Sequence, residues 1–265
     1  MRLIMENWRR FITEATAVPK EQMVGFKQAI LDSNFWTQPH TENDVDEIGE
    51  TTNMASPASE ALMSALNAKA EELGTDINFV ITVTTEDGYE LAPDDQFGGY
   101  PNNWMMQGQY RGPQGGLHVV WIELRPISEE FNMDDLNPGE LAKKISTTIN
   151  HELVHYNQLK KQAESKGISD EDAFEEMMND PKQMDKTGTR AGYLSRHIEV
   201  DAFAHEAAEE LLDKYSEEEA LDLIRRKNPD VQGVVADYVD ALGDQPEELQ
   251  KFWKKLYTQI RKQAK

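Results

Sequence analysis

The 265-residue chain contains no cysteine. It therefore has neither a disulfide framework nor a zinc site built from thiolates, while its redox compartment stays open. It also lacks any apolar run close to the roughly 20 residues that cross a bilayer. The apolar stretch between Met1 and Glu6 is too short, before the first acidic residue, for a secretory signal. We therefore expect a cytoplasmic protein without a membrane span, in the host cytoplasm or the virion if the chain is viral.

Positive charge is scarce as well. Lys and Arg number 27 against 49 Asp and Glu, which gives a net charge of −22. This charge repels the phosphate backbone of nucleic acids and the surface of anionic membranes, so neither is expected as a partner. The sequence also has no internal repeat, no Walker phosphate loop and no glycine fingerprint for a dinucleotide.

What the chain does have is an HExxH motif, His151-Glu152-Leu153-Val154-His155. Residues four apart stand nearly above one another on an α-helix, so His151 and His155 can bind the same metal ion. Glu152 stays free to take a proton from water. This separation of roles is typical of zinc hydrolases, and it makes the chain a candidate metallopeptidase.

The residues around the motif favour a helix that follows a strand. Asn137 is a candidate N-cap, Pro138 suits the first helical position, and Glu140 could reach back as in a capping box. The run 117–124 is apolar and β-rich, as expected of a buried strand, and 77–85 predicts another. An apolar stripe on the motif helix lies well away from the histidines and consists of Ala142, Ile145, Ile149, Leu153 and Tyr156. A strand that leads into an HExxH helix is the zincin arrangement.

A catalytic zinc normally takes three protein ligands, so a third is expected downstream. The helix-compatible segment 193–206 carries Glu199 on one side and His197, Asp201 and His205 roughly opposite. One straight helix cannot present both sets to one metal. The longer side chain favours Glu199, whereas a rotation of the helix by about half a turn would bring Asp201 inward, and carboxylates of either length bind zinc.

The HExxH motif followed by Glu199-Val200-Asp201-Ala202-Phe203-Ala204 resembles the gluzincin plan. The second segment is similar to the E-A-N-x-F-A signature of ImmA/IrrE-type metallopeptidases. The resemblance implies one zinc ion per chain with His151, His155 and Glu199 as ligands and Glu152 as the general base. It also implies a zincin-like fold and a peptide or protein substrate.

Other parts of the site are less well specified. An oxyanion donor besides zinc is needed, and Tyr193, Arg196 and His205 are candidates, with Tyr193 favoured. The polar connection 164–192 is either a lid or an insertion with no role in catalysis. The aromatic-bearing stretch 93–116 predicts an ordered surface loop, with a substrate-facing rim as the alternative.

These observations predict an α+β, mostly helical protein: a zincin-like domain with a small β-sheet, an HExxH active-site helix and helical N- and C-terminal flanks. Residues 1–55 would form N-terminal helices and an acidic linker, 56–215 the metallopeptidase domain, and 216–265 a helical extension packed on that domain. The predicted function is zinc-dependent peptide hydrolysis. The alternative is a non-catalytic regulatory or virion-associated binding protein whose zinc site is structural or vestigial. Glu152 favours the enzyme, because a purely structural site needs no base there.

Overall fold

The computed structural model describes residues 18–37, 57–83, 104–126, 138–180, 190–226, 233–243 and 246–264. The chain divides into a sheet unit, Pro19–Leu153, and a helical unit, Val154–Lys265 with Met1–Val18. The division falls inside helix α4, Pro138–Lys166, which therefore contributes to both units. The mostly helical α+β class is confirmed. The domain boundaries at 55 and 215 stay predictions.

Three strands of the sheet unit form one sheet in the order β1-β3-β2. Strand β1, Ile77–Val83, is parallel to β3, Leu117–Pro126, and β2, Trp104–Gln114, is antiparallel to β3. Gly115 and Gly116 connect β2 to β3 with φ angles of +62° and +88°, which glycine adopts without steric strain. Both strands predicted from the sequence are present.

The prediction of a loop over 93–116 is wrong for Trp104–Gln114, which forms β2. Strand alternation is concealed here, because Gly108 occupies an inward position and contributes no apolar side chain. Its neighbours at the same spacing are the partly buried Met106 and the buried Tyr110, whereas Gln107 and Gln109 are exposed. An alternating pattern with a glycine at its centre does not stand out in sequence.

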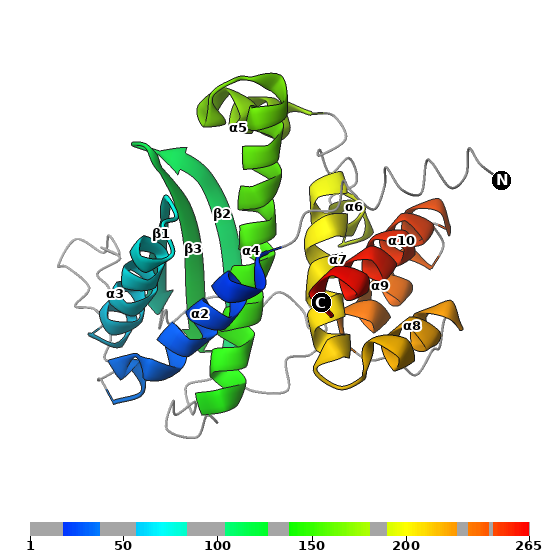
Figure 1. The fold of residues 1–265 in the computed structure, drawn as a ribbon, viewed down its shortest axis with the longest axis horizontal. Coiled ribbons are helices and arrows are strands. Elements are labelled where there is room, and N and C mark those ends of the chain that lie inside the picture. The colour runs from blue at the N-terminus through cyan, green and yellow to red at the C-terminus, as the bar shows by residue number, and fades with distance from the viewer. Residues whose placement is uncertain are drawn as a thin grey trace. The chain divides into compact units, whose positions relative to one another are not determined.

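Helices α2 and α4 pack on the same face of this sheet. The ring of Phe26 on α2, Lys20–Asp32, meets that of Phe79 edge to face with centroids 5.1 Å apart. Phe79 aligns through β3 with Tyr110, so Gly108 shares that face, and Gly108 lies against α4. Helix α3, Pro57–Glu72, lies beside β1, where Asn67 bonds the backbone N–H and C=O of Phe79 (Figure 1). A short 3-10 helix, Asn34–Thr37, follows α2.

The helical unit contains the second half of α4 and six further described helices. These are α5 Asp170–Asn179, α6 Arg190–Leu194, α7 His197–Leu212, α8 Glu217–Arg225, α9 Val234–Leu242 and α10 Pro246–Gln263. Their core centres on Tyr238 of α9, whose ring stacks on Phe252 of α10 with centroids 3.9 Å apart. Helix α10 runs beside α7 (Figure 1).

The predicted helix start at Pro138 is reproduced, whereas the helix-compatible segment 193–206 is interrupted at Ser195 and Arg196, between α6 and α7. Helix α8 opens with a capping box of Ser216 and Glu219, and the side chain of Ser169 caps α5. The helix predicted near the N-terminus, with Ile4 to Ile12, lies outside the described residues. None of the helices in the described ranges combines the length and the apolar character of a membrane-spanning segment.

Candidate metal centre

Both motif histidines lie on the continuous helix α4 and are buried. The helix begins at Pro138 as predicted, while its expected N-cap Asn137 lies outside the described residues. His151 and His155 retain only 6% and 7% of their exposure, although α4 also buries a complete apolar stripe. Two imidazoles withdrawn from water on one helix face need polar partners, which a metal ion can supply.

Glu199 of α7 lies beside His155 within the helical unit. Its Oε2 is 3.5 Å from His155 Nε2, and both side chains are nearly inaccessible to solvent. This separation is long for a good hydrogen bond. Ligands about 2.0–2.2 Å from a tetrahedral zinc ion lie about 3.3–3.6 Å apart, so the spacing fits an edge of that tetrahedron.

His151 stands one turn before His155 on the same helix, and it belongs to the same cluster. Ligand atoms of His151, His155 and Glu199 all lie within 4.8 Å of one another. This buried cluster could bind a metal ion. The structure thus brings together the three residues that the sequence offers as zinc ligands, while ligation itself stays a prediction.

Gln158 connects the two helices that carry this cluster. Its Oε1 lies 3.1 Å from His155 Nδ1, and its Nε2 donates to the carbonyl oxygen of Ile198 at 3.1 Å. When Nδ1–H donates to Oε1, the Nε2 lone pair of His155 is directed to the side where Glu199 lies. One side chain therefore orients an imidazole and anchors the residue before Glu199.

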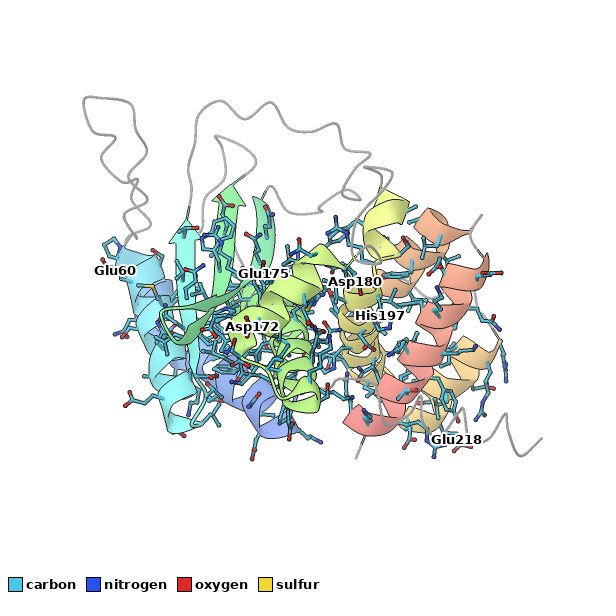
Figure 2. All side chains as sticks on the ribbon, turned by 90° about the horizontal axis from the view of Figure 1, so that it is seen from above. Glu60, Asp172, Glu175, Asp180, His197 and Glu218 are labelled. Atoms are coloured by element: carbon cyan, nitrogen blue, oxygen red, sulfur yellow. The ribbon has the colours of Figure 1, made fainter. Side chains whose placement is uncertain are left out.

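The opposite side of α7 faces α10. Asp201 Oδ2 lies 3.0 Å from Lys255 Nζ, and both side chains are buried. His205 Nδ1 lies 3.0 Å from Nε2 of Gln263, which is also on α10. His197, labelled in Figure 2 at the start of α7, is exposed. In this structure Glu199 is therefore the α7 carboxylate beside His155, and Asp201 pairs with a lysine.

Glu152 is held by the sheet. Its Oε2 accepts a hydrogen bond of 2.7 Å from the backbone N–H of Tyr110, and the Tyr110 phenol lies 2.5 Å from His118 Nδ1. A Cβ at Gly108 would stand 2.5 Å from Thr148 Cγ2 and 2.7 Å from Glu152 Oε1. Only glycine lets the strand approach the helix this closely.

Tyr193, the favoured oxyanion donor, lies on α6 and is 37% exposed. Its ring meets Phe203 edge to face with centroids 6.2 Å apart, and the Arg196 guanidinium lies 5.0 Å from its centroid. These contacts place Tyr193 beside α7 without assigning it a catalytic role, which stays a prediction. The lid predicted over 164–192 is also untested, and 181–189 lies outside the described residues.

The phenol of Tyr238 lies in the core of the helical unit and is influenced by carboxylates of α7. Its hydroxyl donates to the carbonyl of Leu194 at 3.0 Å. Burial raises the pKa of Tyr238 well above its ordinary value, and the negative charge of Glu199 raises it further. The contribution of Asp201 to this pKa is smaller than that of Glu199. Tyr238 is thus a natural reporter of the Glu199 charge.

Sequence reasoning missed three contributors to this arrangement. Gln158 follows His155 by three residues, a spacing at which helix side chains share a face, so it could have been found. Lys255 is 54 residues from Asp201 and gives no local signal. Tyr110 acts through its backbone N–H, which every residue except proline has.

No known protein family, curated protein or solved structure gives a match to this chain. The gluzincin resemblance therefore stays a prediction.

Proposed function

We propose that the protein is a zinc-dependent metallopeptidase. The observation that carries the proposal is that α4 keeps the metal-binding residues apart from the candidate base. His151 and His155 cluster with Glu199, while Glu152, between them on the chain, is held elsewhere by Tyr110. A zinc hydrolase needs this separation of ligands from the base.

The donor set fits zinc. Two imidazoles and one carboxylate are common zinc ligands, and the 3.5 Å separation of His155 Nε2 and Glu199 Oε2 suits tetrahedral binding. Three protein ligands leave one position for water or substrate, as in catalytic sites, whereas structural sites are closed by four. When bound, zinc would polarise the scissile carbonyl and bring the attacking water towards ionisation at neutral pH.

The protein groups then handle the protons. Tyr110 N–H fixes one oxygen of Glu152, which keeps the carboxylate in one orientation. Glu152 accepts a proton from the attacking water and delivers it to the leaving amine. Gly108 supports this role, because any larger residue would displace Glu152 or the strand.

A peptide is the substrate class that the surroundings favour. Strand β2, which holds Glu152, lies at the edge of the described sheet. Extended peptides add to such edges through backbone hydrogen bonds, with alternate side chains turned to either face. A peptide bound along β2 would run past the base.

The decisive experiment combines metal analysis with a peptide-library assay on the full chain. We expect one zinc ion per chain and chelator-sensitive hydrolysis. Glu152→Gln should fold and keep zinc while losing turnover by a factor of about 10² or more, because general base catalysis contributes on that scale. Glu164→Gln, an exposed site on the same helix, is the matched control and should leave turnover unchanged.

The outcomes separate the two functions considered. Protein that neither contains nor takes up zinc contradicts the metal centre. Zinc binding with no hydrolysis, or with equal turnover by wild type and Glu152→Gln, contradicts the enzyme and favours a non-catalytic protein with a structural or vestigial site.

A further inference from the structure

The turn of α7 formed by residues 199–202 is buried on every side, so polarity alone does not fix the rotation of the helix about its own axis. Glu199, Val200, Asp201 and Ala202 are consecutive and all buried, and four residues complete a turn. Further along, the buried positions include the short side chains Ala204, Ala207 and Ala208. Short side chains form shallow ridges, which interlock weakly with neighbouring helices.

Polar contacts from α10 fix the rotation of α7, which the apolar packing leaves unspecified. Lys255 Nζ lies 3.0 Å from Asp201 Oδ2, and the two side chains are only 6% and 4% exposed. One turn further along α7, Gln263 Nε2 donates to the carbonyl oxygen of His205 at 3.0 Å. Two successive contacts thus hold the same side of α7 against α10.

This side of the helix determines where Glu199 points. Glu199 precedes Asp201 by two residues, which places it about 200° around the helix. With Asp201 against α10, Glu199 lies beside His155. A rotation of about half a turn would exchange the two carboxylates. Since either can bind zinc, ligand chemistry does not choose between the two rotations.

The ion pair is better suited to specifying this arrangement than to stabilising the fold. Asp201 Oδ1 is buried and has no hydrogen-bond partner among the described groups. A buried pair whose oxygens are incompletely bonded gains little over an apolar pair of similar volume, although it restricts how the helices can pack.

We propose that Lys255 is a positioning residue whose ion pair with Asp201 sets the rotation of α7 and thereby selects Glu199 as the third ligand. The ligand role of Glu199 rests on the proposed function. The placement of Glu199 beside His155 does not, because the contacts that produce it involve no metal.

The test replaces the ion pair by apolar side chains in the full chain, as Lys255→Met with Asp201→Leu. Two quantities are measured: nuclear Overhauser contacts between the His155 ring and the Glu199 side chain without metal, and zinc affinity by chelator competition. We expect the contacts to be lost and the affinity to fall by at least about tenfold, the scale on which misplaced supporting groups act. Lys251→Met removes an exposed α10 ion pair with Glu248 and should change neither quantity.

A second variant covers the case in which the apolar pair fails to fold. The charge-reversed pair, Lys255→Asp with Asp201→Lys, should keep the His155–Glu199 contacts. Folded protein that loses them overturns the proposal, as does an apolar pair that retains them, whatever its zinc affinity. If wild-type protein binds no zinc, the metallopeptidase proposal fails by itself, and the metal-free contacts still decide the role of Lys255.

Discussion

The two sides of α7 carry the same chemical group in different surroundings. Glu199 and Asp201 are both buried carboxylates, two residues apart. Asp201 meets an ammonium group from α10, whereas Glu199 lies beside an imidazole from α4. On the α10 side the ammonium compensates the negative charge. On the α4 side the carboxylate joins two histidines in a cluster that a cation would complete.

This difference teaches that the partner helix, and not the residue itself, decides what a buried carboxylate does. Burial of a charge is unfavourable unless another charge or a metal compensates it. The two sides of α7 therefore predict different responses to single substitutions. Removing one member of the Asp201–Lys255 pair should mainly lower the stability of the fold, because it leaves a buried charge uncompensated, whereas removing Glu199 should mainly weaken metal binding.

The largest effect is expected where the compensating charge is removed. Lys255→Met leaves Asp201 buried without its ammonium partner and should lower the free energy of unfolding by about 3–5 kcal/mol. Denaturant unfolding measures this loss. Lys251→Met, at an exposed pair of the same helix, should change it by less than about 1 kcal/mol. Equal losses from both variants would remove the distinction between the buried pair and a surface pair.

The second prediction concerns the Glu199 side of α7, and the quantity measured is the affinity for zinc. Structural zinc is bound with about 10–16 kcal/mol, or roughly 2.5–4 kcal/mol for each of four ligands, so Glu199→Ala should weaken zinc binding by about 10²- to 10³-fold. Asp201→Asn can still accept the hydrogen bond of Lys255 and should weaken it by about tenfold or less. If Asp201→Asn were the weaker binder, the assignment of the two sides would be reversed.

A smaller effect is expected at the residue that joins α4 to α7. Gln158→Leu removes the hydrogen bonds to His155 and Ile198, so the imidazole loses its fixed orientation. Zinc affinity should fall by about 10–100-fold, as is usual for groups that orient metal ligands. Gln162→Leu, one turn further along α4, is the control and should retain wild-type affinity. Loss of affinity in both would point to a general disturbance of the helix.

The smallest effect concerns Tyr238, which senses both carboxylates. Because burial and the Glu199 charge raise its pKa, the folded state holds the phenolic proton more tightly than the unfolded chain does. Its stabilising contribution is complete below about pH 10, the ordinary tyrosine pKa, and is lost as pH rises through the raised value. Unfolding free energies measured from about pH 9 upwards should show this decline, and Tyr238→Phe should reduce it.

The pKa of Tyr238 also allows the charges of Glu199 and Asp201 to be compared directly. Glu199→Gln should lower the Tyr238 pKa more than Asp201→Asn does, because Glu199 raises it more. Alkaline titration of tyrosine absorbance measures both changes. A larger shift in Asp201→Asn would mean that the charge of Asp201 dominates at α9.

Much of the fold follows from local sequence signals. Ser216 with Glu219, Ser169 and Pro138 mark helix starts that the structure reproduces, because capping depends on residues within one turn. Strand β2 was missed because its packing against α4 requires a glycine, and Gly108 interrupts the pattern that reveals a strand.

The candidate site, like the fold, could be predicted only where it depends on local sequence. The spacing of His151 and His155 is a property of one helix and could be predicted. Side-chain length and the family resemblance favoured Glu199 over Asp201, but nothing in that segment reveals that Asp201 pairs with Lys255, 54 residues away. Long-range partners of this kind leave no periodicity in the sequence that surrounds them.

Glu199 also lies in the first turn of α7. The peptide dipoles of a helix add up to a partial positive charge at its amino end, which favours an anion there. The helix backbone thus supplies part of the stabilisation that a bound cation would otherwise provide alone. We therefore expect the metal-free chain to reach its folded structure first and to acquire its metal afterwards, at a site that is already assembled.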